Sequence, residues 1–444
     1  MSENSNNSTT NENDMESHYN LRGYIILWIG QLVSLLGSSI VQFAIVWWIT
    51  ITTESEFMLA ISFFLGFAPT VFLIPIAGVF VDRWSRKKII ATVDFFQALV
   101  TVFLIYLFMI GLESWVLMIW VLAIITLRAI FQAFHNPAVD AIIPLLVPKE
   151  KLSRMNGLNY FFTGIIFLTG PIIGAVLLEI WFIWEVMWID AITFFFAIIP
   201  TIIIAIPSIK AKTIPSEEKP RFREEFSEGF IFIKSKEGLL ALLTVFTAAN
   251  FFINPIFVLL PMYVKYNHLG GATDLAFIMA VQQFGIIAAS IFMSTWRGFE
   301  NNANGVVIGL FAMYIGFLIC TITPTGNFLI LACGMVIMGF FLPVANIASQ
   351  TIWQKIVPPE KMGRVMSVRR SIAQSSGPIS TILSGIIAEL LGIVPVFLLA
   401  ISMGLFFLGF SWFMTGFRNV EKTAVPTEIA MEKSLSPVPD IGLE

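Results

Sequence analysis

The chain has little of what metal sites and nucleotide-driven machines require. It contains only two Cys and three His in 444 residues, and the histidines at positions 18, 135 and 268 are widely separated. It has no zinc-binding HExxH pair, and because no Gly is followed by Lys it has no phosphate-binding loop. The sequence therefore implies no metal and no cofactor. It also argues against an ATP-driven pump, and we expect that the chain is not an enzyme.

Charge is also scarce, and long apolar stretches take its place. Charged residues make up 12% of the chain, against roughly 25% in an average soluble domain. A membrane-spanning helix needs about 20 apolar residues, whereas barrel strands alternate over about ten. We therefore predict an all-α membrane protein with 12 transmembrane helices. The predicted spans are Tyr24–Thr50, Phe57–Phe80, Ile89–Gly111, Trp115–Phe134, Leu158–Ile180, Trp181–Ile206, Leu239–Val264, Leu275–Trp296, Val306–Ile322, Phe328–Ile347, Ser371–Leu391 and Val394–Phe417.

The distribution of cations predicts the orientation. If the N-terminus lies in the cytoplasm, every Lys and Arg falls on that side except Lys265, which lies outside, and Arg128, which lies within the fourth span. Cytoplasmic loops are enriched in Lys and Arg, so both termini are expected in the cytoplasm of a multi-pass protein of the cell membrane. The first residues are rich in Ser, Asn and Thr and have no apolar core, which predicts a disordered tail and not a signal peptide.

The spans divide into two sets of six around a basic linker. Within that linker, RFREEFSEGFIFIKSK places Phe222, Phe226, Phe230 and Ile233 at helical spacing, so we expect an amphipathic helix on the inner membrane surface. The predicted organisation is a tail (1–21), a six-helix bundle (22–207), the linker (208–238), a second six-helix bundle (239–418) and a second tail (419–444).

The two halves also resemble each other in sequence. VPKEKLSRM, beginning at Val147, is echoed by VPPEKMGRV, beginning at Val357, and each is followed by a Gly-Pro pair in the next span. These pairs are Gly170-Pro171 and Gly377-Pro378. Repeated halves with a binding site between them are common in secondary transporters. Chance similarity of short loops is the alternative.

The loop between the second and third spans carries a recognisable motif. GVFVDRWSRKK, from Gly78 to Lys88, resembles the loop signature of the major facilitator superfamily, with Ser85 where that signature usually has Gly. GFAPTVFLIPIAGVFVDRWSRKK and RAIFQAFHNPAVDAIIPLLVP look like the branch that contains macrolide efflux proteins and enterobactin exporters. The resemblance covers roughly residues 22–418. Gly170-Pro171-Ile172-Ile173-Gly174 partly matches the antiporter motif of drug exporters.

This resemblance implies that the loop is a gate. Gly78 would allow helices to approach closely, and Asp82 would face the positive N-terminus of a helix in the other half, span eleven by analogy with the family. Arg83, Arg86 and Lys87 would pair with acids and with anionic headgroups. The simpler alternative is that these cations only set the topology, but topology alone requires neither Gly78 nor Asp82.

Polar side chains recur at helical spacing inside four of the predicted spans. They are expected to line a central cavity, as they do in the family. The alternative for any single residue is a hydrogen bond between helices, worth about 0.6 kcal/mol on average. The stripes are Gln31, Ser34, Ser38 and Gln42; Arg128, Gln132 and His135; Thr247, Asn250 and Asn254; and Asn346 and Gln350.

Three charged residues in the first half are candidates for proton coupling. Arg128 lies past the middle of its span and requires a carboxylate or a water-filled cavity. Asp190 is our preferred coupling acid, whereas we expect Asp94 to join the basic loop network. Arg128 could instead form a fixed ion pair or bind an anionic group of the substrate.

The features together predict a secondary transporter that works by alternating access. The expected activity is proton-coupled export of amphipathic or hydrophobic small molecules of the macrolide or multidrug kind. The alternatives are a siderophore, lipid or nutrient transporter of the same fold, or a receptor or scaffold that does not transport. The expected partners are a small molecule, protons and the lipid bilayer, with no nucleic acid, and the two halves could act as a monomer.

Overall fold

The structure is a computed structural model that describes residues 20–204 and 222–423, in which long helices are joined by short turns. The first-half helices are α2 (Leu21–Thr53), α3 (Glu56–Arg83), α4 (Arg86–Met109), α5 (Ser114–Asp140), α6 (Ile143–Leu146), α7 (Lys149–Ile180) and α8 (Ile183–Ile203). The remaining elements are α9 (Phe222–Ser235), α10 (Leu239–Met262), a π-helical turn (Tyr263–Asn267), α11 (Ala272–Thr295), α12 (Asn302–Ile322), α13 (Phe328–Ile356), α14 (Pro359–Leu391), α15 (Ile393–Met414) and the 3₁₀ segment η2 (Gly416–Thr423).

Eleven helices in this part of the chain are long and apolar enough to cross a membrane. The twelfth long helix, α14, has 33 residues but includes four cations and a run of hydroxyl side chains, which lower its mean hydropathy. These cations are Lys361, Arg364, Arg369 and Arg370. The prediction of an all-α membrane protein is confirmed.

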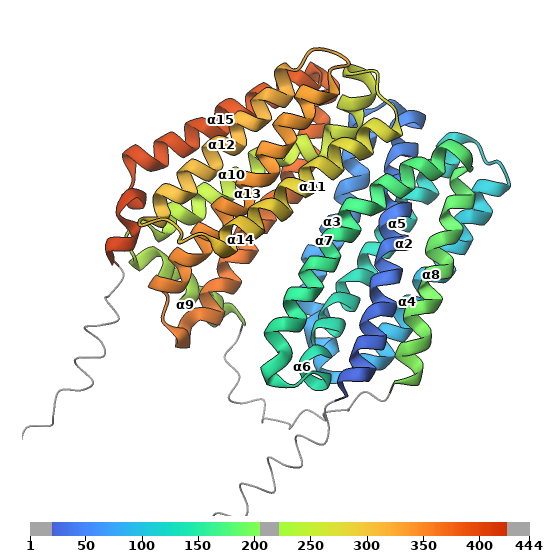
Figure 1. Cartoon of the computed structure of the whole chain (residues 1–444), viewed down its shortest axis with the longest axis horizontal. Helices are drawn as coiled ribbons and strands as arrows, with labels where there is room; N and C mark the ends of the chain where they lie inside the picture. The colour runs from blue at the N-terminus through green and yellow to red at the C-terminus, as the bar shows by residue number, and fades with distance from the viewer. Residues whose placement is uncertain (1–19, 205–221, 424–444) are drawn as a thin grey trace, which may run out of the picture.

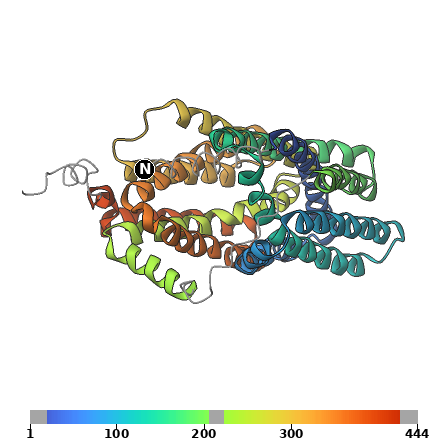
Figure 2. The same ribbon diagram turned by 90° about the horizontal axis from the view of Figure 1, so that it is seen from below.

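The long helices form two bundles that lean against each other (Figures 1 and 2). Within the first half α2 packs on α7 and α8, α3 on α5, and α4 on α5 and α8. In the second half α13 packs on α11 and α12, and α10 packs on α14 and α15. The halves meet chiefly where α3 contacts α14 and where α7 contacts α11. Any site between the bundles is therefore framed by α2, α3, α7, α10, α11 and α14.

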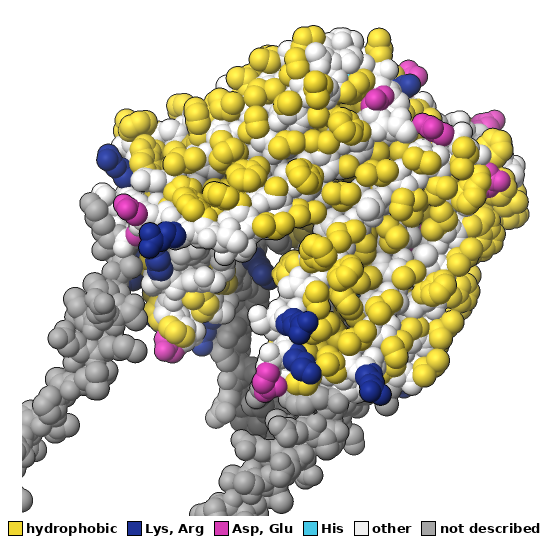
Figure 3. Space-filling model, in the orientation of Figure 1, with side chains coloured by type: hydrophobic (Ala, Val, Ile, Leu, Met, Phe, Trp, Pro, Cys, Tyr) yellow, Lys and Arg dark blue, Asp and Glu magenta, His cyan; other side chains and the backbone are white. Residues whose placement is uncertain are grey.

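The two ends of this structure differ in charge. We call the end that holds α6, α9 and the turn at Trp84-Ser85 the basic end, and the end that holds the turns at Glu54-Ser55 and Gly270-Gly271 the distal end. Lys and Arg side chains gather toward the basic end, which is the lower end in Figure 3, and the surface between them and the distal end is apolar. That apolar belt is the surface expected to face lipid.

The sequence echo between the halves corresponds to a shared local structure. Val147 and Val357 are extended, each is followed by a Pro at the helix N-cap, and α7 and α14 begin at the next residue. The carbonyls of Pro148 and Pro358 accept hydrogen bonds of 2.9 and 3.0 Å from the backbone N–H groups three residues later. Both helices start well before the predicted spans, because their charged first turns are helical although they are too polar to lie in the bilayer.

The amphipathic linker helix is present as α9, and it packs against the second half. Ile233 is fully buried, and a Cβ placed on Gly229 would lie 2.9 Å from the carbonyl oxygen of Arg364 on α14. An ion pair of 2.6 Å joins Glu228 to Arg364. Helix α9 is therefore docked on α14, and only part of its apolar face, including Phe230, stays exposed. The side chain of Phe222 lies outside the described residues.

The distal end closes the gap between the halves. Glu389 Oε2 of α14 accepts hydrogen bonds from Ser55 Oγ (3.0 Å) and from the backbone N–H of Phe57 (3.2 Å). A Cβ on Gly385 would be only 2.3 Å from the Cβ of Ala60, so α14 and α3 are in close contact there. Toward the basic end the space-filling view shows a hollow between the halves (Figure 3). The structure is therefore closed at the distal end and open at the basic end.

Candidate functional site

A cavity of about 620 Å³ lies between the two halves. Helices α2, α3, α4, α5, α7 and α8 of the first half line it together with α10 and α11 of the second. The predicted polar residues that reach it come from α2, α4 and α5, so the polar stripes of the first half do face a shared space. These residues are Gln31, Ser34, Ser38, Gln42, Asp94, Arg128, Gln132 and His135.

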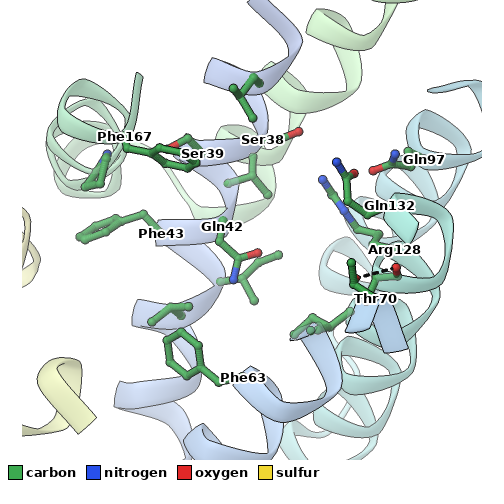
Figure 4. A pocket seen from close by; sticks show the side chains of 18 of the residues that line it. Ser38, Ser39, Gln42, Phe43, Phe63, Thr70, Gln97, Arg128, Gln132 and Phe167 are labelled. Atoms are coloured by element: carbon green, nitrogen blue, oxygen red, sulfur yellow. Dashed lines mark hydrogen bonds between the residues drawn. The ribbon is translucent and has the colours of Figure 1, made fainter. Parts of the chain in front are cut away.

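The cavity has one polar and one aromatic side (Figure 4). Gln97, Arg128 and Gln132 lie together on α4 and α5 at one side of the view, and Phe43 of α2 and Phe167 of α7 lie together at the other side. Amide and guanidinium groups can hydrogen-bond a ligand, whereas aromatic rings bury its apolar surface. A ligand that is itself amphipathic would match both sides.

Arg128 and Asp190 form a saturated ion pair on the first-half wall. Arg128 Nη1 lies 2.7 Å from Asp190 Oδ2, and the same oxygen accepts a 3.0 Å hydrogen bond from Thr101 Oγ1. Ser38 Oγ donates to Asp190 Oδ1 at 2.7 Å. The Asp190 side chain is completely buried, and that of Arg128 is 17% exposed. Burying a carboxylate without such partners would be costly, so the set explains how Asp190 is accommodated.

Asp94 forms a second pair, with a different kind of partner. His135 Nε2 lies 2.9 Å from Asp94 Oδ1, and Gln31 Nε2 donates to Asp94 Oδ2 at 3.1 Å. The His135–Asp94 contact has ion-pair distance without hydrogen-bond angles, since Nε2 is a buried atom with no hydrogen-bond partner. Asp94 is 1% exposed and is held by α2 and α5, not by the basic loop as we expected.

The polar residues predicted to line the cavity from α10 and α13 are not on its wall. Asn250 Nδ2 donates to the carbonyl of Ala373 at 3.2 Å, Arg369 donates to Gln350 Oε1, and Asn346 is exposed. The second half instead contributes Phe257, Leu260, Pro261, Leu275, Met279, Gln282 and Gln283. A substrate role for Asn250, Asn254, Asn346 and Gln350 stays a prediction.

The loop motif is only partly visible. A Cβ on Gly78 would meet no atom of the described residues within 4 Å, so the close helix approach that we expected there is not found in this part of the chain. Lys87 Nζ donates to the carbonyls of Ile202 and Ile204 at 2.6 and 2.9 Å and so holds the end of α8 in its own half. Arg86 Nε is buried without a hydrogen-bond partner among the described residues. The side chains of Asp82 and Arg83 lie outside the described residues.

The first Gly-Pro segment provides close packing. A Cβ on Gly170 would be 2.2 Å from Ser39 Oγ, and one on Gly174 would be 3.0 Å from the carbonyl oxygen of Ile40. Small residues one turn apart therefore bring α7 against α2, as in other membrane helix pairs. Pro171, between them, lines the cavity.

The second Gly-Pro segment lies where the halves meet. A Cβ on Gly377 would be 3.4 Å from Phe67 Cε1 of α3, and the carbonyl of Gly377 accepts a 3.3 Å hydrogen bond from Asn254 Nδ2. Asn254 also donates to Thr381 Oγ1 at 2.7 Å. Pro378 is buried within α14. This segment therefore connects α10, α14 and α3, and a hinge role for it stays a prediction.

Sequence reasoning missed Gln97 and Thr101 of α4. Both lie on the face of Asp94, three and seven residues further on, so the helical spacing that revealed the other stripes was present here too. Gln97 lines the cavity and Thr101 binds both Asp190 and Arg128, at 3.0 Å each. With these two residues, the polar wall extends over α2, α4, α5 and α8.

Comparison with known proteins gives the family. The Major Facilitator Superfamily model matches residues 27–381 and 268–439. Macrolide efflux protein A of Streptococcus pyogenes is 31% identical over 391 residues, covering 86% of this chain and 93% of that protein. The staphyloferrin A transporter of Staphylococcus aureus is 24% identical over 370 residues, covering 82% and 88%.

Solved structures agree with this assignment at the level of the fold. A bacterial homologue of the iron transporter ferroportin in its inward-facing state superposes with a TM-score of 0.67 at 16% identity, covering 88% of this chain and 99% of that one. The nucleoside transporter NupG gives a TM-score of 0.66 at 13% identity, with the same coverage. The chain is a multi-pass membrane protein that belongs to the Major Facilitator Superfamily of transporters.

Proposed function

We propose that this protein exports amphipathic small molecules across the cell membrane by alternating access, in exchange for protons. The observation that carries the proposal is the central cavity, which both halves line and which is closed at the distal end. A site between two repeated halves becomes accessible from the other side when the halves rock against each other.

The basic end faces the cytoplasm in this proposal. Lys and Arg are enriched in cytoplasmic loops, and the basic end carries Arg86, Lys87, Lys355 and Lys361. The structure is then open to the cytoplasm and closed to the outside. Opening outward would break the contacts of Glu389 with Ser55 and Phe57.

The charges on the cavity wall support a neutral or cationic ligand. Arg128 is neutralised by Asp190 at 2.7 Å, so it is not free to attract an anion. Asp94 faces the cavity with only a histidine and an amide as partners. A macrolide with one amine fits this pattern and fits the name of the 31% identical relative. An anionic siderophore fits it less well, although one relative is a staphyloferrin A transporter.

Proton coupling requires a group whose charge changes during the cycle. The candidates for this group are Asp94, which lines the cavity, and Asp190, whose charge is set by its ion pair with Arg128. No carboxylate of the second half lines the cavity among the described residues, so coupling would be confined to one half. The pathway needs only the two halves of one chain, so we propose that the monomer is active.

The proposal is tested by filling the cavity. Gln42 projects into it from α2, so Gln42→Trp should remove macrolide export from a susceptible bacterium that expresses the protein. The matched control is Ile26→Trp on the same helix, where the side chain is 56% exposed on the outer surface and export should persist. Equal export by both variants, at equal amounts of membrane protein, would contradict a central pathway.

A further inference from the structure

We propose that His135 is the group that takes up and releases the transported proton, with Asp94 as its charged partner and a second cavity as the route to the basic end. This inference rests on the proposed function. It differs from our expectation that Asp190 is the coupling acid, and it assigns the role to a residue that lies at the boundary of two cavities.

The two buried carboxylates, Asp190 and Asp94, have partners of different chemistry. Arg128 keeps its charge at all accessible pH values, so Asp190 has a permanent cation beside it. Histidine changes its charge between about pH 5 and 8. With neutral His135 the Asp94 pair carries one negative charge, and with protonated His135 it carries none. Of the two pairs, only His135–Asp94 can change its net charge while its two side chains stay in contact.

No hydrogen bond holds His135 in one protonation state among the described residues. Its Nε2 atom lies 2.9 Å from Asp94 Oδ1 but without hydrogen-bond angles. No other side chain fixes the ring by a hydrogen bond among the described residues. The ionisable groups around it are Asp94 on α4, Tyr24 on α2, and Asp140 and Arg128 on α5, while α7 contributes the uncharged Asn159 and Thr163.

A second cavity connects His135 to the basic end. Its volume is about 310 Å³, and it shares Gln31, Leu35, Gln132 and His135 with the central cavity. The rest of its wall includes Tyr24, Asn136, Asn159 and the exposed carboxylate Asp140. Because Asp140 follows His135 by five residues, it lies about 7.5 Å further along α5, toward α6 and the basic end.

The geometry therefore gives a complete proton step. An N–H bond of the imidazolium breaks, the electron pair stays on the ring nitrogen, and the proton passes to water in the second cavity or to the Asp140 carboxylate. Uptake is the reverse step. Release leaves one negative charge at Asp94 beside the central cavity, which favours a ligand with a cationic amine. Proton and cationic ligand would then occupy the wall of the first half in turn.

The first test needs no substrate. The chain has three histidines, so ¹³C labelling at Cε1 gives three signals in detergent micelles, and the one missing in His135→Gln is His135. The signal is recorded from about pH 5 to 8, the range in which an imidazole exchanges its proton. The proposal predicts that its chemical shift changes with pH and that Asp94→Asn alters this change. A signal that does not move across this range would overturn the proposal.

The second test separates coupling from transport in proteoliposomes, with radiolabelled erythromycin as the probe. In His135→Gln, accumulation driven by a pH gradient should fall by about tenfold or more, while counterflow exchange at equal pH stays within about twofold of wild type. Asp140→Asn should slow accumulation and spare counterflow. The matched control is His268→Gln, a buried histidine that packs on Tyr263 in the second half and should leave both activities intact.

The outcomes distinguish the two proposals. Full gradient-driven accumulation by His135→Gln would overturn the assignment of the proton site, and loss of accumulation in Asp190→Asn alone would return that role to Asp190. If the wild-type protein shows counterflow but no response to pH, the assignment of the proton site is overturned and the proposed transport of macrolides is retained. Wild-type protein that shows neither activity would reject macrolide export, and the histidine titration would still decide whether His135 exchanges a proton.

Discussion

Two carboxylates are buried in the wall of the first half, and their partners separate their roles. Asp190 is enclosed by Arg128, Ser38 and Thr101, so each of its oxygens is satisfied by groups that do not titrate near neutral pH. Asp94 instead contacts His135 and Gln31, and both of these residues border the two cavities. The comparison indicates that a permanent cation makes a carboxylate a structural anchor, whereas a titratable partner makes it a switch.

Removing the permanent cation should have the largest effect. In Arg128→Met, Asp190 is left buried without a counter-charge, and the free energy of unfolding should fall by about 3–5 kcal/mol. Reversible unfolding in mixed micelles measures this loss. The double variant Arg128→Met with Asp190→Leu should recover most of it, because no charge is then left unpaired. A single variant as stable as wild type would show that Asp190 is not held as an anion.

A smaller effect is expected where the uncharged hydroxyl partner of this ion pair is removed. Thr101→Val keeps the shape of the side chain but loses the 3.0 Å bonds to Asp190 and to Arg128, which should cost about 1–3 kcal/mol. Thr201→Val is the matched control, because Thr201 is equally buried but bonds only to the carbonyl of Ala197 in its own helix. If the free energy of unfolding falls equally in both variants, the hydrogen bonds around Asp190 stabilise the protein no more than an ordinary bond within a helix.

Glu421 offers a carboxylate outside the membrane for comparison. Burial opposes its ionisation, but the hydrogen bonds from Asn302 and Lys355 outweigh burial and lower the pKa of Glu421 below its ordinary value of 4.5. The resulting stabilisation is complete above about pH 4.5 and is lost as the pH falls toward the lowered value. Glu421→Gln should cost about 1–2 kcal/mol at pH 7 and flatten this acid dependence.

The control for Glu421 is the exposed Glu300, for which no ion pair is found among the described residues. Glu300→Gln should change the free energy of unfolding by less than about 0.5 kcal/mol at any pH from 4 to 7. A similar acid dependence in wild type and Glu421→Gln would mean that other carboxylates set it.

The smallest effect on stability is expected at Asp94. Gln31→Met removes the 3.1 Å bond to Asp94 Oδ2, but both cavities border this site and water can take the place of the amide. The free energy of unfolding should change by less than about 1 kcal/mol, while the pH midpoint of macrolide transport shifts. Calorimetry and transport between pH 5.5 and 8 measure the two quantities. A large loss of stability without a shift in midpoint would make Asp94 an anchor like Asp190.

The sequence was sufficient to predict the helices and most of the polar wall of the first half. Hydropathy predicted the membrane spans. The helical spacing of four polar residues predicted which face of α2 borders the cavity; these are Gln31, Ser34, Ser38 and Gln42. It could not show whether a polar face meets a cavity or a neighbouring helix. Asn254 has the same spacing as the residues of α2, yet it hydrogen-bonds Thr381 on α14.

Pairing across helices was also beyond the sequence. Asp94 lies six residues after Lys88, which favoured an assignment to the basic loop, but the rotation of α4 about its axis directs it to His135 on α5. The docking of α9 was missed for a similar reason, because an apolar face can be covered by lipid or by protein. The small Gly229 allows α14 to approach it closely.

The most direct test of the account measures both ends of the protein at once. With Cys320 and Cys333 replaced by Ser, spin labels are attached at Lys88 and Glu360 on the basic end, or at Glu113 and Thr325 on the distal end, all of them exposed. Distances are then recorded with and without erythromycin at pH 5.5 and 8. Alternating access predicts that conditions which shorten the basic-end distance lengthen the distal-end distance. Distances that both stay fixed, or that change in the same direction, would contradict it.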